Sequence, residues 1–180
     1  APTMPHTHTP RLLLLLTALH ATLACQLLSS LPDHGLHLLH TMAPSSAHLC
    51  HHQHQHPSFF PDALRHNNRP HPPQHTAFCI LDNLLHTLSS QRVPQHWDNH
   101  ARQLLLNSLH QHQHRLQQCL THSATLPPRS CNHMLSVNRY FRTIQNFLND
   151  HNHSLCAWEH VRLEAHLCLQ NLHNLTRTTH

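Results

Sequence analysis

The sequence contains a single glycine, Gly35, among 180 residues. Phosphate-binding loops, dinucleotide-binding turns and the nucleophile elbow of hydrolases need glycines where the backbone turns sharply or approaches a ligand. The composition therefore excludes these sites. Tight β-hairpins also depend on glycine for positive φ angles, whereas helices do not, so an all-α fold is favoured over a β-rich one.

Charged residues are also few, at 10% of the chain, and lysine is absent. All eleven basic residues are arginine, and with seven acidic residues the formal net charge is +4. This charge is too small and too scattered for a nucleic-acid-binding face, which needs clustered basic side chains. Hydrophobic residues make up 38% of the chain, which suits one domain with a single core.

An apolar run near the N-terminus predicts a secretory signal peptide over residues 1–24. Arg11 precedes the five leucines 12–16, and the run ends in Ala21-Thr-Leu-Ala24, whose small residues fit a cleavage site. The folded domain is then expected at 25–180, in a secreted, extracellular protein. A buried helix is the alternative, but the apolar run is continuous rather than periodic. The run is too short to span a membrane, so no membrane insertion is expected.

Secretion would place all the cysteines in an oxidising compartment. The chain has seven of them, and an odd number leaves at least one thiol unpaired or paired with another chain. They are Cys25, Cys50, Cys79, Cys119, Cys131, Cys156 and Cys168. Composition alone does not choose among the possible pairings. Asn152-His-Ser154 and Asn174-Leu-Thr176 match the acceptor pattern for N-glycosylation, which agrees with secretion.

Apolar residues recur at helical spacing in five segments, and no segment alternates convincingly as a strand would. The expected helices cover about 26–42 with a firmer start at Asp33, then 75–89, 94–120, 134–148 and 154–175. Six prolines interrupt residues 43–74, which predicts one long irregular connection containing Cys50. A long crossover lets sequential helices run parallel, so the expected fold is an all-α, five-helix bundle of the cytokine type.

The last two predicted helices carry the clearest apolar stripes, with steps of three and four residues. The first stripe consists of Met134, Val137, Phe141, Ile144 and Leu148. The second consists of Trp158, Val161, Ala165, Cys168, Leu172 and Leu175. Both sets are expected to face the core, and Ser154 is placed to cap the final helix.

The 28 histidines are the most unusual feature of the composition. His51, His52, His54 and His56 follow Cys50, and His110 and His114 stand four residues apart on a predicted helix, a spacing that could share a metal. The enrichment extends through the whole chain, including the predicted signal peptide, which indicates compositional drift rather than a built site. No metal or other cofactor is expected, although a histidine-rich metal-binding protein stays an alternative.

Catalysis is not expected either. A hydrolase needs a nucleophile, a base and an orienting group brought together, and with this many histidines the presence of cysteine and histidine carries little information. No carboxylate pair or glycine-rich turn adds specificity. The protein is therefore predicted not to be an enzyme.

The segment Cys156-Ala-Trp-Glu-His-Val-Arg162 resembles the start of the last helix of the type I interferons. The similarity continues in Val137-Asn-Arg-Tyr-Phe141 and Ile144, and it is strongest to the avian members. The avian pattern is found in Leu38-Leu-His-Thr-Met-Ala-Pro44, Leu88-Ser-Ser90, His96-Trp97, Leu116-Gln-Gln-Cys119 and His173-Asn-Leu-Thr176. These matches stand in the same order and extend from Cys25 to the end.

The resemblance implies a secreted, monomeric cytokine that binds and bridges the two chains of the type I interferon receptor and induces an antiviral response. It also implies two disulfides, Cys25–Cys119 and Cys50–Cys156. Cys79 and Cys131 could then pair or be exposed. Cys168 lies on the core stripe and is expected to be a buried thiol. The alternative function from this fold is a different secreted helical-bundle cytokine.

Receptor contacts are implied on the long connection and on the outer face of the last helix. The residues at those positions are His51, His54, Arg162, Leu163, His166 and Leu167. Leu167 departs from the mammalian pattern, in which a second arginine is frequent there. Leu163 and Leu167 could instead form the edge of the core. Arg139, beside Asn138, is the candidate contact for the opposite receptor chain.

Overall fold

The computed structural model describes residues 31–43, 50, 58–65, 72–122 and 131–177. These residues form five helices of at least 12 residues and one single-turn helix, and no strand occurs among them. The elements are α2 (Leu31–Met42), α3 (Asp62–Arg65), α4 (Pro73–Leu88), α5 (Asn99–His122), α6 (Leu135–Asp150) and α7 (Leu155–Arg177). The predicted all-α, five-helix architecture is confirmed.

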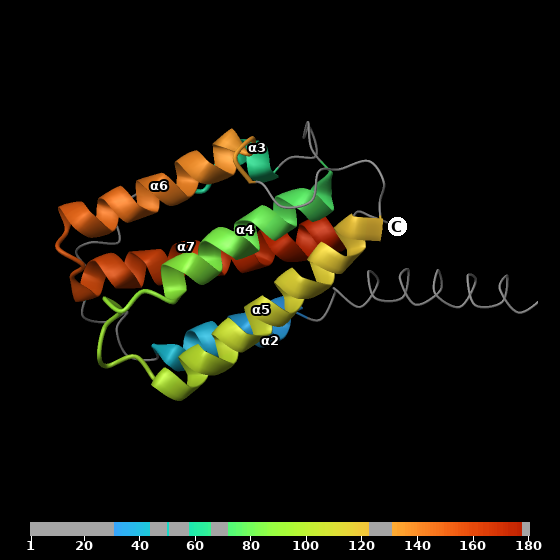
Figure 1. Cartoon of the computed structure of the whole chain (residues 1–180). Coiled ribbons are helices and arrows are strands. Elements are labelled where there is room, and N and C mark those ends of the chain that lie inside the picture. The colour runs from blue at the N-terminus through green and yellow to red at the C-terminus, as the bar shows by residue number, and fades with distance from the viewer. Residues whose placement is uncertain (1–30, 44–49, 51–57, 66–71, 123–130, 178–180) are drawn as a thin grey trace, which may run out of the picture.

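The long helices form a bundle in which α4 and α7 are central (Figure 1). α4 packs on α5, α6 and α7, and α2 packs on α5 and α7. The colours of Figure 1 show that α2 and α4 run in the same direction, while α5 and α7 run in the opposite one. The predicted crossover between two parallel helices is therefore confirmed.

The long connection is more ordered than the prolines indicated. Within it α3 forms one helical turn, and its Leu64 backbone N–H donates to the carbonyl oxygen of Pro61 at 3.0 Å. Phe60 and Leu64 are buried and pack against the main core. The sequence predicted an irregular connection and did not predict the α3 turn within it, because two buried residues are too few to show helical periodicity.

Local chemistry explains where three of the helices begin. α4 starts with Pro73 directly after Pro72, because proline is well suited to the first turn, where its missing N–H leaves no bond unmade. α5 begins at Asn99 rather than at Pro94, since the Asp98 carboxylate accepts from the Ala101 N–H at 2.6 Å and caps the helix. The Ser154 hydroxyl accepts from the Ala157 N–H at 3.4 Å, as predicted for α7.

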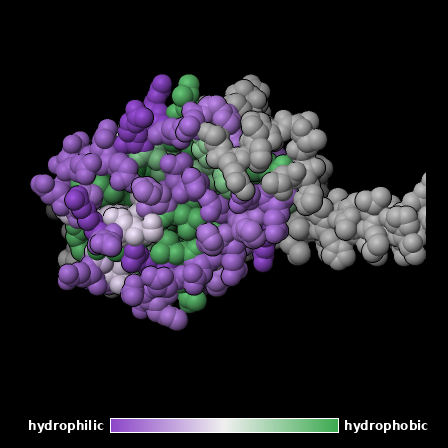
Figure 2. All heavy atoms as spheres, viewed as in Figure 1, coloured by the Kyte–Doolittle hydropathy of each residue, from purple (hydrophilic) through white to green (hydrophobic). Residues whose placement is uncertain are grey.

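Both predicted apolar stripes are buried along their whole length. Trp158 is fully enclosed and meets Trp97 edge to face, with ring centroids 5.5 Å apart. The single glycine also lies in the interior, on α2. A Cβ on Gly35 would stand 3.4 Å from the Leu169 side chain, which is an ordinary van der Waals contact, so the packing of α2 on α7 does not require glycine at this position. The face of the molecule shown in Figure 2 is mostly hydrophilic, with patches of apolar side chains visible between the hydrophilic ones.

Candidate functional site

A buried carboxylate on α7 attaches the long connection to the bundle. Glu164 is 1% exposed, and its Oε1 accepts a hydrogen bond from the Phe59 backbone N–H at 2.9 Å. Its Oε2 accepts from the Ser58 hydroxyl at 3.3 Å and from the Tyr140 hydroxyl of α6 at 2.9 Å. One side chain therefore joins the connection, α6 and α7.

Aromatic packing reinforces this attachment. The half-buried Phe59 ring lies 5.3 Å from the Phe147 ring of α6 and 4.8 Å from the His160 ring of α7, measured between centroids. His160 Nε2 stands 3.7 Å from Glu164 Oε1. The connection is thus held by apolar contacts around a polar centre.

A disulfide fixes the same connection at an earlier point. Cys50 and Cys156 are bonded, with 5.4 Å between their Cα atoms, which confirms the pairing expected for the start of α7. Cys119 is also disulfide-bonded. Its expected partner, Cys25, lies outside the described residues, so the Cys25–Cys119 pairing stays a prediction.

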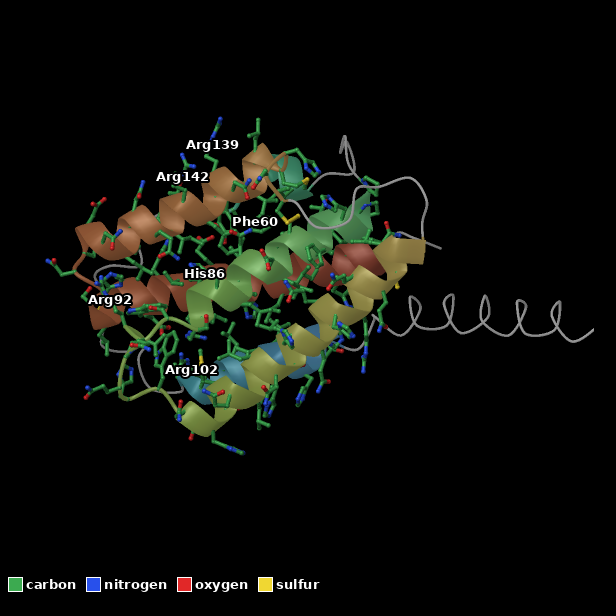
Figure 3. The ribbon with its side chains drawn as sticks, in the orientation of Figure 1. Phe60, His86, Arg92, Arg102, Arg139 and Arg142 are labelled. Atoms are coloured by element: carbon green, nitrogen blue, oxygen red, sulfur yellow. A yellow bond between two sulfur atoms is a disulfide. The ribbon has the colours of Figure 1, made fainter. Side chains whose placement is uncertain are left out.

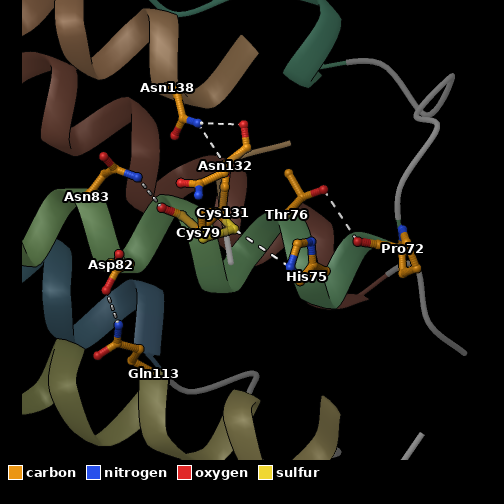
Figure 4. Close-up of a disulfide and its surroundings, with 10 residues drawn as sticks. All are labelled: Pro72, His75, Thr76, Cys79, Asp82, Asn83, Gln113, Cys131, Asn132 and Asn138. Atoms are coloured by element: carbon orange, nitrogen blue, oxygen red, sulfur yellow. Dashed lines mark hydrogen bonds between the residues drawn. A yellow bond between two sulfur atoms is a disulfide. The ribbon is translucent and has the colours of Figure 1, made fainter. Parts of the chain in front are cut away.

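A further disulfide joins Cys79 of α4 to Cys131, shortly before α6 (Figure 4). The sequence left this pairing open. Side-chain amides brace the backbone at both ends of the bridge, since Asn83 donates to the Cys79 carbonyl and Asn138 donates to the Cys131 carbonyl, each at 2.9 Å. The Asn138 amide is therefore hydrogen-bonded within the protein. The neighbouring Arg139 remains the candidate contact for the opposite receptor chain.

Cys168 is a free, buried thiol, as expected from its place on the stripe. Its sulfur lies 3.4 Å from the Tyr140 hydroxyl, and burial raises the thiol pKa to about 12. Burial likewise raises the pKa of Tyr140, with the neighbouring Cys168 and Glu164 adding to the shift. Both groups therefore stay protonated at neutral pH, and the hydroxyl is able to donate to Glu164.

The four candidate contacts on α7 differ in how far they reach the surface. Leu163 is 37% exposed, whereas Leu167 is half-buried and packs against the core. The edge-of-core interpretation therefore describes Leu167 and not Leu163. His166 is half-buried, and burial together with the charge of Arg162 lowers its pKa.

Arg162 is not a freely extended side chain. Its guanidinium donates from Nε to both oxygens of Glu159, at 3.1 and 3.0 Å, and from Nη2 to Oε1 at 2.5 Å. The Arg162 side chain is 11% exposed and the Glu159 side chain is 2% exposed. An ion pair within α7 therefore fixes the arginine at the expected contact position, which the sequence pattern did not reveal.

The remaining contact candidates lie apart from α7 or outside the described residues. His51 and His54 belong to the latter group. Arg139 is exposed on α6, and it points away from the bundle together with Arg142 (Figure 3). Leu135, one turn before Arg139, is 71% exposed. The sequence analysis did not select Leu135, although an apolar residue outside the predicted stripe is the pattern that identifies it.

His110 and His114, the two histidines whose spacing could share a metal, differ in their surroundings from His112 between them. His112 is buried and its ring Nδ1 bonds the Ser108 carbonyl at 2.9 Å, while His110 and His114 are exposed. Burial lowers the pKa of His112, and the nearby charge of Arg115 adds to this. Within the described ranges, no three His, Cys, Asp or Glu side chains are placed to hold one metal ion.

The two sequons have different backbone settings. Asn152 is exposed in the turn between α6 and α7, where it and His153 adopt φ angles of 51°. Asn174 is also exposed but lies within the last turn and a half of α7. Both acceptor asparagines are therefore at the surface, and their occupancy stays a prediction.

Among the residues that the structure describes, none of the helices is long and apolar enough to cross a membrane.

The family model of the interferon alpha/beta domain matches residues 25–179. Interferon of the turkey, Meleagris gallopavo, is 37% identical over 174 residues, covering 93% of this chain and 90% of that protein. Interferon type A1/A2 of the chicken, Gallus gallus, is 38% identical over 149 residues, covering 81% and 76%.

Solved structures agree with the fold. Zebrafish interferon 1 matches with a TM-score of 0.65 at 23% identity, covering 82% of this chain and 92% of that one. Zebrafish interferon 2 matches with a TM-score of 0.64 at 16% identity, covering 79% and 95%. At these identities the likeness concerns the arrangement of the helices alone.

Proposed function

The chain belongs to the interferon alpha/beta family, and we propose from this that it is a secreted cytokine that bridges two receptor chains and induces an antiviral response. A protein of this family is a cytokine and not an enzyme. The family match over residues 25–179 is the observation that carries the proposal. It favours an interferon over other helical-bundle cytokines and over a metal-binding protein.

One proposed receptor face combines the long connection with α7. Its described members are the exposed residues Ser58 and Asp62 of the connection and Leu163 of α7, with Arg162 and His166 beside Leu163. Two attachments support this face: the Cys50–Cys156 bridge and the hydrogen bonds to Glu164. A surface already ordered before binding loses less conformational entropy in the complex, which favours affinity. His51, His54 and Leu167 complete the proposed contacts.

The second proposed face lies on α6. Arg139 and Arg142 extend away from the bundle (Figure 3). Leu135, one helical turn before Arg139, adds an exposed apolar side chain. An apolar residue beside arginines is a favourable composition for the centre of an interface. Faces on two different helices would allow one molecule to bind two receptor chains at once.

The remaining parts of the proposal concern processing and assembly. We propose cleavage after residue 24, glycosylation at Asn152 and Asn174, and a monomeric extracellular product. The exposed positions of both asparagines support the modification sites.

The proposal is tested with secreted protein beginning at Cys25, added to cells of the source animal that are then infected with a cytopathic virus. Wild-type protein is expected to protect the cells at low concentration. Leu163→Glu should lose binding to one receptor ectodomain, and Arg139→Glu should lose binding to the other. Leu104→Glu on α5 is a matched control for Leu163→Glu, because Leu104 is 42% exposed and lies outside that face. Folded wild-type protein that binds neither ectodomain would disprove the proposal.

A further inference from the structure

We propose that Glu164 is a positioning residue, whose buried carboxylate holds residues 58–60 on α7 so that the long connection meets the receptor in one fixed geometry. The inference rests on the proposed function, because it concerns how the first receptor face is ordered. Glu164 itself is 1% exposed and does not touch the receptor in this account. It acts through the backbone that it binds.

The contacts divide into two groups. Phe59 and Ser58 donate to Glu164 from the connection, at 2.9 and 3.3 Å, and Tyr140 donates from α6 at 2.9 Å. The Ser58 hydroxyl oxygen in turn accepts from the Phe60 N–H at 3.1 Å. Three consecutive residues of the connection are therefore tied, directly or through Ser58, to one carboxylate.

The charge of Glu164 makes these bonds strong and mutually dependent. A carboxylate removed from water is costly unless hydrogen bonds replace its hydration, and bonds to an ionised acceptor are stronger than those between neutral groups. No arginine donates to Glu164 in the described part of the chain, and its three donors are neutral groups. His160 Nε2, at 3.7 Å, is the other titratable group facing it across one helical turn. Two of the three donors belong to the connection, so the connection is required to keep this carboxylate buried.

The structure also separates this role from general support of the fold. Tyr140 joins α6 to α7 through the same carboxylate, and its ring meets the Phe60 ring edge to face with 5.3 Å between centroids, a contact that phenylalanine keeps. The Tyr140 hydroxyl makes no hydrogen bond to residues 58–60 among the bonds described. Tyr140→Phe therefore removes a stabilising bond and leaves the two bonds to the connection in place. Glu164→Gln removes the charge from both bonds to the connection and leaves one acceptor oxygen in place of two. The hydroxyls of Ser58 and Tyr140 can accept from the new N–H₂ group, whereas the Phe59 N–H is a donor only.

The experiment measures hydrogen exchange at the Phe59 amide together with binding to the two receptor ectodomains. The proteins compared are wild type, Glu164→Gln, Ser58→Ala and Tyr140→Phe. Ser58 is exposed, so Ser58→Ala keeps the test possible if Glu164→Gln fails to fold. For Glu164→Gln we expect exchange at Phe59 to accelerate about 10- to 100-fold, the range for losing a hydrogen bond to a charged group. Affinity for the first receptor chain should fall about 10-fold, with binding to the second chain unchanged.

Ser58→Ala should show the same changes to a smaller degree, and Tyr140→Phe should lower the melting temperature without selectively accelerating exchange at Phe59. Unchanged protection of Phe59 in both Glu164→Gln and Ser58→Ala would overturn the positioning role. Accelerated exchange with unchanged affinity would overturn its link to the receptor. Wild-type protein that binds neither ectodomain would disprove the proposed function and that link together, whereas the exchange data would still decide whether Glu164 orders the connection.

Discussion

Replacing Arg162 by methionine is expected to lower the free energy of unfolding by about 3 kcal/mol, the lower end of the range for breaking a buried ion pair. Methionine keeps the apolar stem of the side chain and removes the charge. The Glu159 carboxylate, only 2% exposed, then loses three hydrogen bonds from the guanidinium. The lower end applies because the Arg162 side chain retains 11% exposure, so water replaces part of the lost interaction.

A double-mutant cycle isolates this pair from other effects of each change. Arg162→Met, Glu159→Gln and the double variant are unfolded in urea and followed by circular dichroism. The expected coupling energy is about 2 kcal/mol, within the range for directly contacting residues. Arg142→Met, at an exposed arginine on α6, is the matched control and should change stability by less than about 0.5 kcal/mol. A coupling below about 0.5 kcal/mol, typical of an exposed pair, would refute the reasoning.

Three further predictions concern the core, the pH response and a disulfide. Trp158→Ala should lower the free energy of unfolding by about 3–5 kcal/mol. Trp158→Phe should cost clearly less, because the buried Nε1 has no hydrogen-bond acceptor among the described residues; equal losses in denaturant titrations would contradict this. Burial lowers the pKa of His112 in the folded protein below its value in the unfolded chain. The unfolded state therefore binds the proton more readily, and stability is lost as the pH falls below about 6.5. His112→Leu should therefore lose less stability than wild type between pH 7.5 and pH 5, and parallel melting curves for the two proteins would show that His112 is not responsible. Replacing Cys50 and Cys156 together by alanine should lower the free energy of unfolding by about 4 kcal/mol. The Cys79–Cys131 bridge shortens the loop that the Cys50–Cys156 bridge closes to about 55 residues, and the expected loss is calculated for that length. A loss below about 1 kcal/mol would contradict the chain-entropy account.

The helices were predictable because their apolar residues recur with the period of the helix. All members of the stripes from Met134 to Leu148 and from Trp158 to Leu175 are buried. The boundaries were less predictable, since α5 starts where the Asp98 side chain caps it and not where the prolines end. α3 was missed because a single turn has too few residues to show a period.

The sequence indicated which residues of the last helix are candidates for the site, but not the polar interior beneath them. Resemblance placed Arg162 and Leu163 on the outer side of the last helix, and Leu163 does reach the surface. Nothing in the spacing indicated that Glu159 would pair with Arg162 or that Glu164 would bind the distant residues 58–60. The one available indication is that Glu164 directly precedes Ala165 of the core stripe, which places an acidic group at the buried side of a helix. Its partners in the connection, Ser58 and Phe59, lie more than 100 residues away, so only the folded chain reveals them.

The account depends most on one molecule binding two receptor chains through separate faces. Sedimentation velocity on the secreted protein mixed with both receptor ectodomains of the source animal tests this most directly. The account predicts a complex containing one copy of each of the three proteins, which Leu163→Glu and Arg139→Glu each reduce to a complex of two. Ectodomains that compete for the cytokine, so that no complex of three forms at any concentration, would contradict it.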